Sequence, residues 1–424
     1  MDRANVSTDA TRFRRSGRPA GSIIVACVLA TVFGCGAPPR AERAEAEFAE
    51  RAAAEAATNR EGFKAMVARM IERIDQRAAR SPTHEATLDL LALSGGGDYG
   101  AFGAGFLVGW GSIADPEWKR PEFDAISGVS TGALISPFAY AGTDADYPKV
   151  DEFYRNPKSD WVQDRGALFF LPYNPSFMTI PGLERDVRAA VDMPMVARMA
   201  EQSRQGRVLA VGATDLDMAR QHVWNIGGEA EAAVASGSPK RVQDMLLSSA
   251  AIPAVFPPIE IDGSIYADGG VTANVLLRLD AHSPDSLLSQ WRVVHPDRKF
   301  PKTRYWIIIN NQMNQPPRTV QVKWPAVVAP SLATAIRCAT LAEVRWLSAE
   351  ADYVNSKFGA DIEIRVVAIP DEWRAPVKGD FKKESMESLS DLGRKMGADP
   401  SSWQRWTGEQ RSFRKPMPEA PTAK

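Results

Sequence analysis

The residues with the clearest chemical potential are Gly128, Ser130 and Gly132, which form a Gly-x-Ser-x-Gly motif. The motif follows the apolar run 123–126 and precedes 133–136, a run typical of a helix. In this strand–turn–helix setting a serine is held in a tight, strained turn that presents its hydroxyl as a nucleophile. Flanking glycines avoid the clash that side chains would cause there. The motif therefore predicts Ser130 as a catalytic nucleophile, with Gly128 and Gly132 completing a nucleophile elbow.

A second candidate is the glycine-rich run at 94–100, SGGGDYG, which follows a predicted strand and precedes a predicted helix. Gly95, Gly97 and Gly100 also satisfy the dinucleotide-binding pattern GxGxxG, which requires an acidic residue at the end of the second strand. In this chain the serine motif occupies that position. We therefore favour an oxyanion hole, in which the amides of Gly95, Gly96 and Gly97 stabilise a tetrahedral intermediate. A purely structural tight turn is the alternative.

A serine hydroxyl needs a base, and the candidate is Asp268. It follows a hairpin signal, Asp262-Gly263, and precedes two glycines that permit a tight turn. A Ser–Asp–His order, with His282 or His295 as the base, is the alternative. Both histidines lie in sequence typical of loops, so their context does not favour it.

Together, the blocks 94–100, 128–132 and 268–270 resemble the patatin-like phospholipase family in order and spacing. The resemblance implies a three-layer α/β/α sandwich with a mostly parallel central sheet. It also implies a Ser130–Asp268 dyad without histidine, a glycine oxyanion loop, and Gly269 and Gly270 in the turn after the base. The family usually has Asp before the glycines and Arg or Lys before the last one, whereas this chain has Ser94 and Tyr99. The missing cation weakens the expectation of an anchored phosphate head group and leaves the dyad untouched.

The N-terminus predicts a targeting segment. Four arginines between positions 12 and 18 precede the almost wholly apolar run 20–33. As a helix this run is about 21 Å long, too short for a hydrocarbon core of about 30 Å. We therefore interpret residues 1–34 as a signal peptide. The following Cys35 resembles the lipid-modified cysteine of bacterial lipoproteins, which implies a lipid anchor to the bacterial envelope, on the periplasmic face. Ordinary secretion is the alternative.

The rest of the chain divides into three predicted parts. Residues 35–84 are a helical or disordered tether followed by an amphipathic helix that we expect to dock on the main domain, rather than on a membrane. Residues 85–376 alternate short apolar runs with helical runs, which indicates a catalytic α/β domain with a largely parallel sheet. Residues 377–424 are a C-terminal helix and a polar tail.

Composition excludes several classes of protein. The net charge is −1, with 51 basic and 52 acidic residues, which argues against nucleic acid as a partner. The sequence contains no Cys/His cluster, so we expect no metal site, and no motif demands a cofactor. Cys338 is interpreted as a small buried residue on a helix.

The sequence thus predicts a serine lipid acyl hydrolase of phospholipase A or esterase type, whose partners are a lipid or ester substrate and a membrane surface. A histidine-dependent esterase and a catalytically silent lipid-binding lipoprotein are the alternatives.

Overall fold

The computed structural model describes residues 40–166, 174–276, 278–317 and 319–406. The chain divides into two compact units, Met1–Glu45 and Ala46–Lys424. Apart from the first residue of α2, all helices and strands of the described residues lie in the second unit. The predicted signal peptide, Cys35 and the tail from residue 407 lie outside the described residues.

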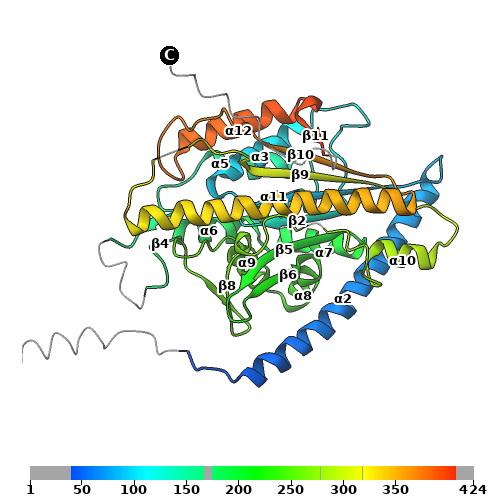
Figure 1. Ribbon diagram of the computed structural model, residues 1–424, viewed down its shortest axis with the longest axis horizontal. Coiled ribbons are helices and arrows are strands. Elements are labelled where there is room, and N and C mark those ends of the chain that lie inside the picture. Colours follow the sequence, from blue (N-terminus) through cyan, green and yellow to red (C-terminus); the bar gives the residue numbers. More distant parts are fainter. Residues whose placement is uncertain (1–39, 167–173, 277, 318, 407–424) are drawn as a thin grey trace, which may run out of the picture. The chain divides into compact units, whose positions relative to one another are not determined.

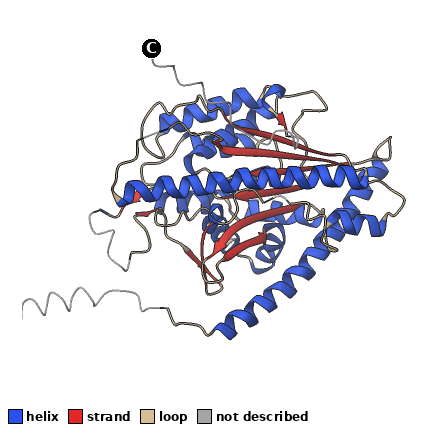
Figure 2. Cartoon of the chain, viewed as in Figure 1, coloured by secondary structure: helices blue, strands red, loops and turns tan. Residues whose placement is uncertain are grey.

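Figure 2 shows the helices and strands of the chain, which alternate along much of the sequence. The helices are α2 (Glu45–Arg80), α3 (Gly100–Trp110), α4 (Thr131–Ala141), α5 (Asp146–Arg155), α6 (Pro181–Ala190), α7 (Met193–Arg204), α8 (Ile226–Ser236), α9 (Lys240–Ser249), α10 (Leu287–Val294), α11 (Trp324–Phe358) and α12 (Lys383–Gly397). The strands of the main sheet are β1 (Thr87–Leu93), β2 (Ala125–Val129), β5 (Val208–Asp215), β6 (Arg220–Asn225), β7 (Ile259–Ile261), β8 (Ser264–Asp268), β9 (Lys302–Gln312), β10 (Ile362–Ile369) and β11 (Gln404–Arg405). A small separate pair consists of β3 (Gln163–Asp164) and β4 (Met178–Thr179).

The main sheet has nine strands in the order β11-β10-β9-β1-β2-β5-β8-β7, with β6 paired to β5 as well. Neighbours from β10 to β5 pair in parallel, whereas β11, β6, β8 and β7 join through antiparallel pairs. Helices flank the sheet (Figure 1). The predicted α/β/α sandwich with a mostly parallel central sheet is confirmed.

Side chains of the central strands alternate between two cores, one on each face of the sheet. On β1, Leu91 and Leu93 enter the core that helices α3 to α9 and α12 cover. Leu90 and Ala92 point the other way, into the core that α10 and part of α11 cover. This period of two places apolar residues on both faces, which explains why the central strands read as continuous apolar runs.

Helix α2 is a single helix that includes the later part of the predicted tether, from Glu45 on, and the predicted amphipathic helix. Its apolar stripe is buried from Val67 on, and Val67, Ile71 and Ile74 pack with Leu88 of β1 and Trp291 of α10. The expectation that this stripe docks on the main domain is confirmed, so it is not available to a membrane surface. Helix α12 packs closely along α3, where a Cβ on Gly393 would lie 2.2 Å from the carbonyl oxygen of Phe102.

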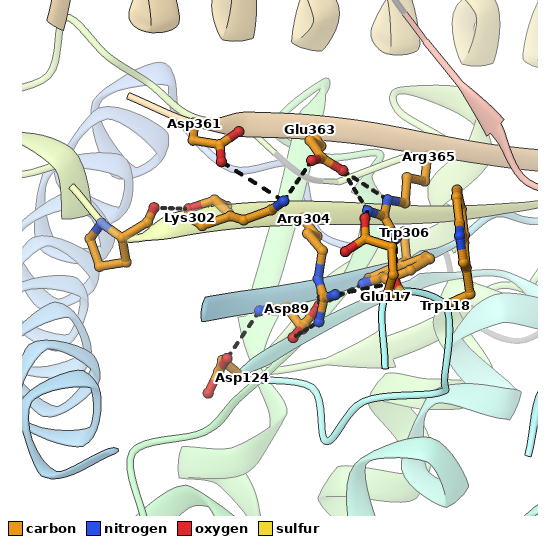
Figure 3. Close-up of polar contacts among 12 residues, drawn as sticks. Asp89, Glu117, Trp118, Asp124, Lys302, Arg304, Trp306, Asp361, Glu363 and Arg365 are labelled. Atoms are coloured by element: carbon orange, nitrogen blue, oxygen red, sulfur yellow. Dashed lines mark hydrogen bonds and ion pairs between the residues drawn. The ribbon is translucent and has the colours of Figure 1, made fainter. Parts of the chain in front are cut away.

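Polar side chains join three central strands near their amino ends (Figure 3). Asp89 of β1 accepts from the Arg304 guanidinium of β9 through both carboxylate oxygens, at 2.7 and 2.8 Å. Its Oδ1 also accepts from the Trp306 indole at 2.8 Å. The side chain of Asp89 is 3% exposed, so loss of one partner would leave a buried charge, at a cost of about 3–5 kcal/mol.

The same cluster continues to β10 through Arg365, whose side chain is fully buried (Figure 3). Its guanidinium carbon lies 4.3 Å from the ring centroid of Trp118 and 4.4 Å from that of Trp306. Glu117 and Glu363 supply its counter-charges. Cation–π contacts and paired carboxylates thus lock the register of β1, β9 and β10. This cluster lies near the amino ends of the strands and does not occupy their carboxyl ends.

Candidate active site

The three predicted blocks meet at one edge of the sheet, where β1 and β2 end and where the antiparallel strand β8 ends beside β5. The glycine loop follows β1, Ser130 follows β2, and Asp268 ends β8. The paired Cα positions at these ends are Leu93–Gly128 between β1 and β2, Val129–Gly212 between β2 and β5, and Ala213–Asp268 between β5 and β8. Open α/β sheets bind their ligands at this edge. Sheet register therefore gathers residues that are far apart in sequence.

Ser130 forms the turn between β2 and α4 with φ 54° and ψ −125°. Such a positive φ is strained for a residue with a side chain, which is the conformation that the motif predicts. The Ser130 amide donates to Ser249 Oγ at 2.9 Å, and the Ser249 hydroxyl donates to the carbonyl oxygen of Gly212 at 2.6 Å. A Cβ on Gly128 would lie 2.5 Å from the carbonyl oxygen of Gly132. The elbow is held in place by this close packing and by the hydrogen bonds that link Ser130 through Ser249 to Gly212 of β5.

The Asp268 side chain lies beside Ser130 in a buried position. Its pKa is raised to about 6 by burial, while hydrogen bonding from the Ser130 side chain and the Gly270 amide acts in the opposite direction. The Gly270 N–H donates to Asp268 Oδ1 at 2.8 Å. A Cβ on Gly269 would lie 2.3 Å from the carbonyl oxygen of Gly212, so this position tolerates only glycine. The turn after Asp268 thus orients its carboxylate toward the serine.

The first amide of the glycine loop is already engaged. The Gly95 N–H donates to Asn274 Oδ1 at 2.8 Å. A donor that is held in this way cannot stabilise an oxyanion without breaking the bond. In this structure Gly95 therefore anchors the loop, in contrast to the expectation that it contributes a donor to an oxyanion hole.

Gly96 and Gly97 carry the remaining amides of the loop. In the part of the chain that the structure describes, neither N–H has a hydrogen-bond acceptor. A Cβ on Gly96 would lie 1.9 Å from the carbonyl oxygen of Asn310 in β9, so the loop is pressed against the sheet there. Gly97 has φ 61° and lines the same pocket as Ser130. These two amides are the donors available to a bound substrate.

The pocket at Ser130 is apolar and narrow. Its free space is about 20 Å³, roughly one water molecule. Side chains must therefore move before an acyl chain can enter. Its lining consists of Gly97, Ser130, Thr131, Leu134, Phe153, Tyr154, Trp161, Leu183, Ala250, Ile252, Phe256 and Phe381.

Sequence reasoning missed Asn274, which links the glycine loop to α11. Its side chain is 2% exposed, and its Nδ2 donates to Thr340 Oγ1 at 2.8 Å. Its backbone N–H donates to the Glu343 carboxylate, whose pKa is raised to about 7 by burial. The only local signal for Asn274 is its place four residues after the Asp268-Gly269-Gly270 block. Its partner Glu343 lies about 70 positions further on in the chain, and its partner Gly95 lies 179 positions earlier.

Asn274→Ala is expected to lower kcat about 10–100-fold with little change in KM, because the loop loses its anchor and its donors shift by a fraction of an ångström to an ångström. Thr340→Val is the matched control, since it removes the other partner of Asn274 and leaves the acceptor for Gly95 in place. The kinetic constants and the Tm of both variants provide the measurement. Equal kcat in the wild type and in Asn274→Ala would contradict a positioning role.

The four histidines lie elsewhere. His295 contacts Asp75 of α2 at 2.9 Å, and His282 packs against the ring of Tyr353. His222 packs against the rings of Trp224 and Tyr266, and His84 lies in the turn before β1. None lines the pocket at Ser130.

Other predicted features fall outside the site. No group of three or more His, Cys, Asp or Glu side chains among the described residues is arranged to hold a metal ion. Cys338 lies on α11 and is exposed, so the prediction that it is buried is wrong. Tyr99, in place of a basic residue, packs edge-on against Trp373 with ring centroids 5.4 Å apart.

Comparison of the sequence with known protein families supports the assignment of the fold and the family. A structural comparison finds the crystal structure of VipD from Legionella pneumophila, at 12% identity and a TM-score of 0.31, over 76% of this chain and 68% of that one. No curated protein matches the sequence. The model of the patatin-like phospholipase family matches residues 91–280, which include the glycine loop from Gly95 on, the elbow and Asp268. Members of this family are lipid hydrolases. The chain therefore carries, between residues 91 and 280, a domain of the patatin-like phospholipase family.

Proposed function

We propose that this protein hydrolyses carboxylic esters of lipids through a Ser130–Asp268 dyad. The observation that carries the proposal is the strained elbow serine beside a buried carboxylate whose pKa is raised to about 6. An ordinary aspartate, with a pKa near 3.9, is a weak base for a hydroxyl proton. Burial raises the basicity of Asp268 while leaving it ionised at neutral pH.

In the proposed reaction, Ser130 Oγ attacks the ester carbonyl carbon while its proton passes to Asp268. The carbonyl π electrons move to the oxygen, where the amides of Gly96 and Gly97 stabilise the negative charge. The intermediate then collapses, the alcohol part of the lipid leaves with the proton from Asp268, and an acyl-serine remains. Water attacks that ester while its proton passes to Asp268; the Ser130 oxygen then leaves with this proton from Asp268, and the fatty acid is released.

The placement of the histidines favours the dyad over a histidine-dependent esterase, because the Asp75, Tyr353 and Trp224 contacts hold them at other elements. The apolar pocket at Ser130 favours a substrate with an acyl chain. The aromatic Tyr99 in place of a cation gives no preference for a phosphate head group.

The test is to incubate the full chain with phospholipid vesicles and identify the products by mass spectrometry. Free fatty acid and a lysolipid are expected, and a fluorophosphonate probe should label the peptide that contains Ser130. A chain that yields neither product nor label would instead be a silent lipid-binding protein.

We further propose that the chain is anchored to the bacterial envelope through a lipid on Cys35, on the periplasmic face. The support is the sequence alone: an arginine-rich start, a short apolar run and the Gly34-Cys35 pair. The acyl mass on the mature N-terminus, measured by mass spectrometry, tests this anchor.

A further inference from the structure

The first half of α11 projects apolar side chains into solvent. None of residues 326–339, here named the α11 arm, is buried, although only Arg337 among these residues is charged. Val327 and Val328 are each more than 40% exposed, and the preceding Val322 is 98% exposed. Scattered apolar residues are common on surfaces, but a contiguous uncharged helical face marks an interaction site.

The second half of the same helix behaves differently. Val344, Leu347, Ala351 and Val354 are buried in the core against β9 and β10. In Figure 1, α11 is one continuous helix from yellow to orange that crosses in front of the sheet. The rigid packing of its second half therefore holds the arm in a fixed place on the domain.

The arm is attached directly to the candidate active site. The Cγ2 atom of Ile336 lies 3.3 Å from the place that a Cβ on Gly270 would take. One turn further on, Thr340 accepts from Asn274, which anchors the glycine loop. A surface that binds the arm thus comes close to the loop and to Asp268.

We propose that the α11 arm is the element that docks this domain on an anionic lipid surface beside the site of hydrolysis. The inference rests on the proposed function, because a lipid hydrolase must extract its substrate from such a surface. Charge supports this partner: between positions 298 and 342 the sequence contains no Asp or Glu, while exposed Lys323 and partly exposed Arg337 flank the apolar residues. Apolar helices with basic flanks bind at the boundary between lipid head groups and acyl chains.

The arm does not fit two other occupants. Ala326–Phe358 is the one helix of the described residues that is long and apolar enough to cross a membrane by length and composition. Its second half belongs to the core, however, and the arm alone is about 21 Å long, short of a hydrocarbon core of about 30 Å. A second copy of the chain is disfavoured, because one side of such a segment offers about half of a lateral surface of roughly 700 Å², which is below the roughly 600–1,000 Å² per partner of a stable dimer.

The test compares two double variants of the full chain. Val327→Glu with Val328→Glu places charges on the arm, and Val293→Glu with Val294→Glu is the matched control on α10, where both valines are exposed. Sedimentation with vesicles that contain phosphatidylglycerol, hydrolysis of vesicle lipid, and hydrolysis of a soluble short-chain ester are measured. The arm variant should lose at least about tenfold in binding and in vesicle hydrolysis, because two apolar anchors become charged. It should keep soluble ester hydrolysis within about twofold, as should the control.

A second measurement reports the arm itself, since the apolar N-terminal segment could also hold the chain on vesicles. Cys338 is exposed at the end of the arm, and Cys27→Ser with Cys35→Ser leaves it as the only cysteine. A polarity-sensitive fluorophore on Cys338 should shift to the blue on addition of these vesicles and be quenched by brominated lipids.

An unchanged spectrum, or equal hydrolysis of vesicle lipid by the arm variant and the wild type, would overturn the proposal. Loss of a dimer in the arm variant, without loss of vesicle binding, would overturn it in favour of a second copy. Failure of the proposed function is distinguishable, because the wild type would then hydrolyse neither substrate while the binding and fluorescence results would stand unaffected.

Discussion

Ser130→Ala is expected to lower the turnover of an ester substrate by a factor on the order of 10⁴–10⁶ while the protein remains folded. The physical reason is that alanine removes the hydroxyl that lies beside Asp268, and no other described serine or cysteine lines the pocket. Residual activity over water would come from the loop amides and from substrate binding alone. Turnover of a soluble ester and of vesicle lipid, together with fluorophosphonate labelling, provides the measurement.

The matched control is Ser136→Ala, which removes a fully buried serine hydroxyl from the adjacent helix α4. Ser136 donates to the carbonyl oxygen of Ala133 and does not line the pocket. Its loss should cost about 1 kcal/mol of stability and leave turnover within a few-fold. Comparable activity in Ser130→Ala and Ser136→Ala would remove the basis for a serine mechanism.

Asp268→Asn is expected to lower kcat by a factor on the order of 10³–10⁴ with a smaller effect on KM. The amide has the shape of the carboxylate and keeps an oxygen for the Gly270 N–H, but it cannot take the proton of Ser130. Asp215→Asn is the control, because Asp215 is a buried aspartate at the end of β5 that caps the turn at Asp217 and Met218. If Asp215→Asn lost as much turnover as Asp268→Asn, the effect would reflect folding rather than base catalysis.

The pH profile supplies a second measure of the same role. Asp268 must be ionised to accept a proton, so activity should be present above its pKa and fall as the pH drops through about 6. Burial also raises the pKa of Asp98 to about 6 and that of Glu343 to about 7, so both groups could produce such a limb. The acid limb of kcat/KM should therefore persist in Asp98→Asn and in Glu343→Gln. A flat profile down to pH 4.5 in the wild type would contradict the assignment of the base.

The local chemistry of the site was readable in the sequence because it depends on short-range geometry. A serine in a strained turn requires Gly128 and Gly132 on its flanks, and the structure places both in contacts that exclude a Cβ. Helix α4 spans the predicted residues 131–141, since an apolar run after such a turn continues as a helix. The Asp262-Gly263 hairpin is confirmed as well, with φ 51° and 75°.

The sequence was less informative wherever the partners lie far apart in the chain. Helices α5, α6 and α7 fill a stretch between residues 146 and 204 in which no strong periodicity predicted them. Cys338 was expected to be buried because apolar helices usually pack against a core, yet this part of α11 extends beyond its packed half.

The sequence by itself determined which residues could carry the chemistry: a nucleophile, a carboxylate and a loop of amides, since each is a local motif with its own steric demands. Only the tertiary structure decided how they act together. Sheet register sets Ser130 beside Asp268, burial raises the pKa of that aspartate, and Asn274 engages the Gly95 amide and leaves Gly96 and Gly97 as donors. The reason is physical: desolvation and hydrogen-bond commitments depend on the distances between distant segments, and these distances exist only after the sheet has formed.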